Sequence, residues 1–456
     1  MSGTQDLEVG ARAAGAADGV TLGVTDTPQT PASGNYDDSV SNGYRAVVLL
    51  MLLLVYTFNF LDRQILGILA GPIKADLGLT DSQLGLLGGL PFAILYSTLA
   101  IPLAMVADKT SRTWVITASL AVWSGFTALC GMANSYTQLF LARIGVGAGE
   151  AGGVAPSYAV IADYFPAGSR ARALAIYSLG IPLGSAAGYF FGGYIAQNFE
   201  WRTTFIAVGV AGLVLAPIFR LVVREPKKKV MAAADGAAPP PATPLGEVFG
   251  ILAKKPAFWL LAFGAASSSL CGYGVAFWLP SLLERSFGLD ILARGQFLGF
   301  LLLIGGVAGV LAGGWLGDRI GGSDKAAYAR IPAISYIIGA PLFIAGVLSN
   351  DMTTAFLLML IPQGLVYIWL APVLTAVQHL VPMHMRATAS ATFLLINNLI
   401  GLGLGSWAVG SLSQALTPAY QGEALRYAIA AALCMYFVAG ALMWLAGKQL
   451  RKAWVD

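Results

Sequence analysis

The feature that most constrains this chain is a series of long apolar runs separated by short polar stretches. Each run reaches about 20 residues, the length at which an α-helix crosses the hydrocarbon core of a bilayer. Among the 456 residues 57% are hydrophobic and only 11% are charged, whereas a soluble domain carries about 25% charged residues. We therefore expect an all-α, multi-pass integral membrane protein.

The runs fall into two groups of six on either side of a break that is rich in basic residues and proline. The predicted spans are 45–70, 82–106, 113–132, 137–162, 173–196 and 203–223, followed by 257–283, 295–317, 329–349, 353–379, 388–413 and 425–447. The predicted domains are a disordered tail over 1–43, a six-helix half over 44–224, a linker over 225–250, a second six-helix half over 251–447 and a tail over 448–456.

The basic residues predict how the chain crosses the membrane. If the tails are cytoplasmic, few of the 27 Lys and Arg residues fall in outer loops. These few are Lys74, Arg202, Arg285, Arg294 and Arg426. The bias predicts cytoplasmic termini. We expect no cleavable signal peptide, because no charged n-region followed by an apolar h-region opens the chain. No Asn-x-Ser/Thr sequon occurs either, which fits a bacterial inner membrane if the source is prokaryotic.

Charged residues stand inside two of the predicted spans. In the first span, Asn59 precedes Asp62 and Arg63 by three and four residues, so all three lie near one helix face. In the fourth span, Arg143 and Glu150 are two helical turns apart and share a face. Charges at this depth cost several kcal/mol and usually mark a substrate or ion pathway. A purely structural ion pair between two helices is the alternative.

An internal repeat relates the two halves. Asp108, Lys109 and Arg112 follow the second span, and Asp318 and Arg319 follow the eighth. Both copies share the pattern small-x-x-small-Asp-basic and recur after six spans. This spacing indicates parallel repeats.

The twelve spans and the repeated motif resemble the major facilitator superfamily. The stretch from Asn59 to Arg63, Asn-Phe-Leu-Asp-Arg, is similar to the first-helix signature of the Spinster family of lipid transporters. The stretch from Arg143 to Glu150, Arg-Ile-Gly-Val-Gly-Ala-Gly-Glu, is similar to a second Spinster signature. The resemblance implies transport by alternating access, with the first and fourth helices facing a central cavity.

The resemblance also implies roles for the loop motifs. Asp108 and Asp318 would hold the outward-facing state by binding the facing half, with Lys109, Arg112 and Arg319 as partners. Ordinary positive-inside anchoring is the alternative for these basic residues.

Our hypothesis is that Asp62 and Glu150 take up and release protons, with Arg143 as the competing partner. Protons are then the coupling ion, and no other cofactor or metal is expected. The candidate substrate-binding residues are Asn59, Asp62, Arg63, Arg143, Glu150, Tyr367, Trp369, Asn397 and Asn398. The aromatic members of this set have packing or interfacial anchoring as an alternative role.

A charged first half that faces an apolar, aromatic second half favours an amphiphilic substrate. The predicted substrate class is a sphingolipid or lysophospholipid, carried by a functional monomer in the bilayer. The alternative is a proton-coupled symporter or exporter of a small organic anion or drug. An enzyme is not expected, because the chain offers no nucleophile–base pair and only two histidines. The Lys227–Lys229 run is interpreted as a solvated patch rather than a nucleic-acid site.

Overall fold

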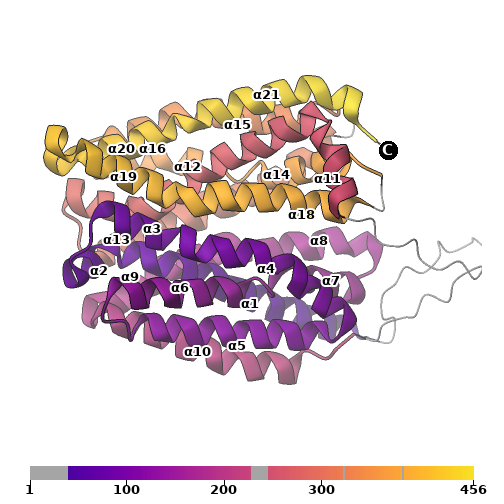
Figure 1. The fold of residues 1–456 in the computed structure, drawn as a ribbon, viewed down its shortest axis with the longest axis horizontal. Coiled ribbons are helices and arrows are strands. Elements are labelled where there is room, and N and C mark those ends of the chain that lie inside the picture. The colour runs from indigo at the N-terminus through magenta and orange to yellow at the C-terminus, as the bar shows by residue number, and fades with distance from the viewer. Residues whose placement is uncertain (1–39, 227–244, 322–323, 383–384, 456) are drawn as a thin grey trace, which may run out of the picture. The chain divides into compact units, whose positions relative to one another are not determined.

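The computed structural model describes residues 40–226, 245–321, 324–382 and 385–455, and within these ranges every regular element is a helix. The first helices, here called the N-half, are α1 (Asn42–Ile68), α2 (Ala70–Leu77), α3 (Asp81–Gly88), α4 (Leu90–Lys109), α5 (Arg112–Cys130), α6 (Tyr136–Glu150), α7 (Val154–Tyr164), α8 (Ala167–Ser178), α9 (Gly180–Asn198) and α10 (Trp201–Val222). Figure 1 shows them gathered in one layer, from indigo to magenta.

The second set, here called the C-half, follows the short helix α11 (Leu245–Ala253). Its helices are α12 (Pro256–Phe287), α13 (Ile291–Leu301), α14 (Val307–Gly321), α15 (Ala327–Leu348), α16 (Met352–Leu365), α17 (Leu370–Gln378), α18 (Arg386–Asn397), α19 (Gly403–Tyr420), α20 (Ala424–Leu433) and α21 (Met435–Ala453). Two π-helical turns, η1 (Leu302–Gly306) and η3 (Asn398–Leu402), and the 3₁₀ turn η4 (Gln421–Glu423) join neighbouring helices. The C-half forms the second layer in Figure 1.

Each predicted span is occupied by a helix or by consecutive helices, so the all-helical prediction is confirmed. Among the described residues, ten stretches are long and apolar enough to cross a membrane, and one of them, Thr388–Ala453, covers 66 residues. The helices α6 and α7 fill the predicted fourth span as two short pieces. The exact number of spans and the side of the termini stay predictions.

The helices extend beyond two predicted domain limits. The helix α11 begins inside the predicted linker, and α21 continues to Ala453 in the predicted C-terminal tail. Residues 1–39 and 227–244, which hold most of the predicted tail and linker, lie outside the described residues.

Local sequence signals explain where many helices begin and end. The side chain of Ser41 accepts a hydrogen bond from the Tyr44 amide at the start of α1. Thr80 and Gln83 form a reciprocal capping box at the start of α3. Gly78 and Gly288 take left-handed φ values of 63° and 65° after α2 and α12, a conformation that glycine adopts without strain.

Small residues set how closely the helices pack. On α9, a Cβ added at Gly188 would lie 2.7 Å from the carbonyl oxygen of Leu61 on α1. Between the halves, a Cβ at Gly85 on α3 would overlap the carbonyl oxygen of Ser406 on α19, and the Ser406 hydroxyl donates a 2.7 Å hydrogen bond to the Gly85 carbonyl. The first contact packs α9 closely on α1 within the N-half, and the second brings the two layers together at backbone distance.

The termini mark one end of the helix layers. The Tyr44 hydroxyl at the start of α1 donates a 2.9 Å hydrogen bond to the Val222 carbonyl at the end of α10. The C-terminus lies at the same end of the layers in Figure 1. We call this the termini end, and the opposite end, where α2 meets α3 and α12 meets α13, the far end.

Candidate transport site

A buried cluster of charges joins α1 to α6 in the N-half. Asp62, Arg143 and Glu150 are 1%, 2% and 0% exposed, and the Arg63 side chain is 8% exposed. The Arg63 Nε atom donates a 2.8 Å hydrogen bond to Glu150 Oε2, and its Nη2 atom also lies 2.8 Å from that oxygen. The structure therefore brings the predicted charges into one region and pairs Arg63 with Glu150.

Aromatic rings surround the Arg63 guanidinium. Its central carbon lies 4.9 Å from the ring centre of Phe60, 4.8 Å from that of Phe92 and 4.6 Å from that of Tyr96. Ring faces attract a cation most strongly where water is excluded. Arg63 is thus held between the Glu150 carboxylate and an aromatic wall.

Asp62 and Arg143 are placed differently from the Arg63–Glu150 pair. Asp62 Oδ2 accepts a 2.8 Å hydrogen bond from the Thr127 hydroxyl on α5. Within the described residues no carboxylate oxygen lies within salt-bridge distance of Arg143, whose guanidinium carbon instead lies 5.4 Å from the Phe92 ring centre. The predicted competition of Arg143 for the carboxylates stays a prediction.

Several buried polar atoms in this cluster have no hydrogen-bond partner within the described part of the chain. They are Asn59 Oδ1, Asp62 Oδ1, Glu150 Oε1, Arg143 Nε and Arg143 Nη1. A buried polar atom without a partner costs about 1–3 kcal/mol, and more when it is charged. Each acid therefore offers one oxygen to a proton, a water molecule or a substrate group.

A separate cavity lies between the two halves. It has a volume of about 160 Å³, well above the roughly 15 Å³ that one water molecule requires. Its lining is Phe60, Gln64, Ile181, Ser185, Tyr189, Ser268, Ser269, Gly272, Tyr273, Val275, Ala276, Leu279, Leu298, Leu301, Leu302, Phe343, Gln363, Val366, Tyr367, Trp369, Leu370 and Tyr436. None of these residues is charged.

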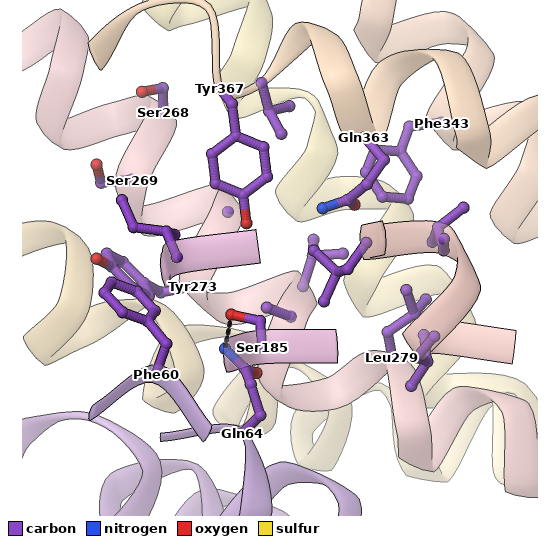
Figure 2. A pocket seen from close by; sticks show the side chains of 18 of the residues that line it. Phe60, Gln64, Ser185, Ser268, Ser269, Tyr273, Leu279, Phe343, Gln363 and Tyr367 are labelled. Carbon is purple, nitrogen blue, oxygen red and sulfur yellow. Dashed lines mark hydrogen bonds between the residues drawn. The ribbon is translucent and has the colours of Figure 1, made fainter. Parts of the chain in front are cut away.

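The polar groups of the cavity come from both halves. Figure 2 shows Gln64 of α1 and Ser185 of α9 on one side, joined by a 3.4 Å hydrogen bond, and Gln363 and Tyr367 of the C-half on the other. Apolar side chains such as Leu279 line the cavity beside these polar groups. The cavity can accept hydrogen bonds from a ligand and donate them while contacting a large apolar body.

The predicted substrate residues of the C-half lie at or behind this wall. Tyr367 and Trp369 line the cavity. Asn397 is buried and accepts a 2.9 Å hydrogen bond from Ser269, which lines the cavity. Asn398 begins the π-helical turn η3. The cavity residues Gln64, Ser185 and Gln363 were missed, because neutral side chains give little signal in an apolar run.

The motif after the second span forms a network at the termini end. Arg112 Nη2 lies 3.0 Å from Asp108 Oδ1, and Arg112 Nη1 pairs with Asp163 on α7. Lys109 is exposed. In the second copy, Arg319 lies with its guanidinium carbon 5.1 Å from the Trp315 ring centre, and the Asp318 side chain lies outside the described residues.

Glu225 closes this network around the start of α5. Its carboxylate accepts hydrogen bonds of 3.0 Å and 2.9 Å from the Arg112 and Thr113 amides, and of 2.5 Å and 2.6 Å from the Ser111 and Thr113 hydroxyls. Burial by itself raises the pKa of Glu225, but the hydrogen bonds from Ser111 and Thr113 outweigh it and hold the pKa below its usual value. An acid at this helix N-terminus is also stabilised by the helix dipole.

At the far end, one acid links the two halves. Asp81 on α3 is 6% exposed and accepts hydrogen bonds of 2.7 Å and 2.8 Å from Arg285 on α12. Lys74 Nζ and the Ser413 hydroxyl of α19 lie 2.6 Å and 2.9 Å from the same carboxylate. We call this cluster of four residues the far-end clasp. Sequence reasoning missed it, because its members look like ordinary loop and helix-end residues.

Comparison with known proteins places the chain in a family. Residues 52–406 match the model of the Major Facilitator Superfamily. The chain belongs to the major facilitator superfamily. It is therefore a membrane transporter, and the expectation that it is not an enzyme is confirmed.

Relatives of this major facilitator include an efflux pump and Spinster proteins. An "MFS-type efflux pump" of Mycolicibacterium smegmatis is 34% identical over 88% of this chain and 92% of its own length. "Protein spinster homolog 1" of Xenopus tropicalis is 25% identical over 85% of this chain and 78% of its own length.

A solved structure also resembles this major facilitator. The crystal structure of a bacterial homolog to the human lysosomal transporter Spinster, inward-facing and unoccupied, is 30% identical and has a TM-score of 0.80. The structural alignment covers 91% of this chain and 100% of the chain of the homolog. The same homolog in its occupied conformation has a TM-score of 0.77. The resemblance to the Spinster family is confirmed.

Proposed function

We propose that this transporter moves an amphiphilic lipid of the sphingolipid or lysophospholipid class by proton-coupled alternating access. The observation that carries the proposal is the separation of the two sites. A cavity without charged residues lies between the halves, and a buried charge cluster lies beside it in the N-half. The uncharged cavity suits the apolar body of the substrate, and the charge cluster suits the proton. The similarity of the first-helix motif to Spinster lipid transporters supports the substrate class.

Phe60 and Arg63 connect the two sites. Phe60 lines the cavity and lies 4.9 Å from the Arg63 guanidinium, which binds Glu150. A proton on Glu150 would weaken its hold on Arg63, and a change in Arg63 would reach the cavity through Phe60. Asp62 offers a second proton site one residue away, fixed by Thr127. With cytoplasmic termini, the far-end clasp would close this arrangement on the side away from the cytoplasm.

The alternative function is export of a drug or a small organic anion. The relationship to an efflux pump favours a drug. A small anion is disfavoured, because an anion requires a charged or strongly donating wall and the cavity lining holds no cation.

Transport in proteoliposomes tests the substrate class. The purified chain is reconstituted in phosphatidylcholine vesicles. Under an imposed pH gradient, the movement of a labelled lysophospholipid, a labelled cationic drug or labelled glucuronate across the membrane is measured. We expect movement of the lysophospholipid that rises with the gradient and is lost in Tyr367→Ala. Movement of the drug or glucuronate without the lysophospholipid would overturn the lipid assignment.

Distance measurements test the proton assignment. Spin labels at Lys109 and Arg319, exposed at the termini end of each half, report its opening in a chain whose exposed Cys434 is replaced by Ser. We expect two populations of the Lys109–Arg319 distance, one for each state of the transporter, whose proportions shift between pH 8 and pH 4. The Asp62→Asn, Glu150→Gln double variant should lose this shift. An unchanged shift in the double variant would refute proton coupling through these acids.

A further inference from the structure

A second hollow lies at the termini end of the C-half, away from the transport cavity. It forms where α11 meets α12 and where α21 ends, and it has a volume of about 310 Å³. Three lysines, Lys254, Lys255 and Lys452, line it together with Trp454. Among the described residues no acid lines it, and it shares no lining residue with the cavity between the halves. We call it the basic hollow.

One wall of the basic hollow is the fixed end of the chain after α21. The Val455 amide donates a 2.7 Å hydrogen bond to the His379 carbonyl. The Trp454 ring stacks on His379 at 4.4 Å and on Tyr328 at 5.3 Å between ring centres. Lys325 lies 4.7 Å from the Trp454 ring centre. This wall is therefore held by packing and hydrogen bonds.

The polar groups that line the hollow are mainly hydrogen-bond donors. Lys255 Nζ is fixed by a 2.5 Å hydrogen bond to the Leu380 carbonyl. Within the described residues the Trp454 Nε1 atom is buried and has no hydrogen-bond partner. The 32-residue helix α12 begins here at Pro256 without a side-chain cap. The ammonium groups and the helix N-terminus together favour an anion with several acceptor oxygens.

The surroundings indicate that the anion is attached to a lipid. The hollow lies at the start of one candidate membrane span, Pro256–Phe287, and at the end of another, Thr388–Ala453. It is therefore at the depth of the lipid head groups. In the first turns of α12, Trp259 stacks on Phe263 at 5.7 Å and contacts Phe249 edge-on at 6.2 Å. Phe249 and Phe263 are 45% and 44% exposed, which leaves an apolar surface for acyl chains.

We propose that the basic hollow binds the phosphate of an anionic phospholipid in the leaflet at the termini end. Basic sites between helices on the cytoplasmic side are a general means of binding such head groups. The bound lipid would join α12 to the end of α21, two elements that are far apart in the C-half sequence. This site is independent of the transported substrate.

Lipid binding to the full chain in detergent tests the proposal. Native mass spectrometry compares phosphatidylglycerol with phosphatidylcholine for the wild type and for the Lys254→Gln, Lys452→Gln double variant. The matched control is Lys109→Gln, Lys448→Gln, which removes the same charge from exposed lysines outside the hollow. Lys255 is kept, because its hydrogen bond supports the fold.

We expect the wild type and the control to prefer phosphatidylglycerol. The Lys254, Lys452 double variant should lose about 30-fold in affinity for phosphatidylglycerol, because each lysine near a lipid surface contributes about a fivefold gain. Arginine at both positions should restore binding. Equal losses in the two double variants would overturn the proposal. If glycerol 3-phosphate displaced phosphatidylglycerol and bound with the same affinity, the proposal would be overturned as well, since the site would then bind a soluble phosphate.

Discussion

The two ends of this transporter use their charges in different ways. At the far end, Asp81 of the N-half binds Arg285 of the C-half, so the ion pair joins the two layers. At the termini end, Arg112 binds Asp163 within the N-half, and Glu225, just after α10, caps α5 of the same half. The first arrangement has to break when the far end opens. The second can remain intact in either state.

This difference indicates where the energy of switching is stored. Removing one partner from a buried ion pair costs about 3–5 kcal/mol, because the other charge is left without compensation. Asp81 is 6% exposed, but Arg285 and Lys74 have side chains that are 26% and 35% exposed, so the lower end of that range applies. A conformational equilibrium shifts tenfold for about 1.4 kcal/mol. The free energy of the far-end clasp is therefore large enough to bias the conformational equilibrium toward the state that is closed at the far end.

The largest expected effect is that of Asp81→Asn. Removing the carboxylate charge leaves Arg285 and Lys74 facing each other without an anion, so we expect opening of the far end by at least about tenfold in population. Spin labels at Gln197 and Thr353, exposed on the two halves at that end, should report a new, longer distance.

Asp76→Asn is the matched control for that experiment. Asp76 Oδ2 lies 2.8 Å from Arg202 Nη2, and both residues belong to the N-half at the same end. Its loss should leave the distance distribution unchanged. If both variants behave alike, or if Asp81→Asn keeps the closed distance, the clasp does not hold the halves together.

The second expected effect is steric. In Gly85→Ala, the new methyl group would overlap the Ser406 carbonyl across the interface of the halves. Overpacking of this kind costs about 1–3 kcal/mol, and separation of the halves at the far end relieves it. The same Gln197–Thr353 distance should lengthen, by less than in Asp81→Asn.

Gly125→Ala is the control for the steric variant. Gly125 lies on α5 with no atom within 4 Å of an added Cβ. In this helix alanine is favoured over glycine by about 1 kcal/mol, so the variant should be neutral or slightly more stable in thermal unfolding. A Gly85→Ala protein that keeps both its stability and its distances would show that the halves do not pack at backbone distance there.

The sequence predicted the architecture better than the pairing of the charges. The lengths of the apolar runs and the repeated Asp-basic motif were sufficient for the helical halves and the family. Helical spacing placed Arg143 and Glu150 on one face, but a shared face does not tell which base reaches the acid. The pairing of Glu150 with Arg63 depends on how α1 and α6 pack, and that is decided by side chains from several helices.

The far-end clasp is a second contact that the sequence could not predict. Asp81 follows Thr80 at a helix start, where an acid is common for reasons of capping alone. Arg285 lies far along the chain near the end of α12. Their contact exists only after the halves assemble, so no local pattern reports it.

The smallest expected effect is at the termini end, in Glu225→Gln. Loss of a helix cap costs about 1 kcal/mol. The Glu225 carboxylate contacts the start of α5 in the N-half, so the inter-half distances should stay as in the wild type. Because the folded-state pKa of Glu225 is lowered, its carboxylate stabilises the fold above the unfolded pKa of about 4.3, and this contribution is lost as the pH falls through the folded value. Thermal unfolding in detergent should therefore separate the variant from the wild type at pH 7 and bring the two together as the pH approaches 3. A pH-independent difference would mean that Glu225 acts through packing alone, and a changed Lys109–Arg319 distance would show that the termini-end network does bridge the halves.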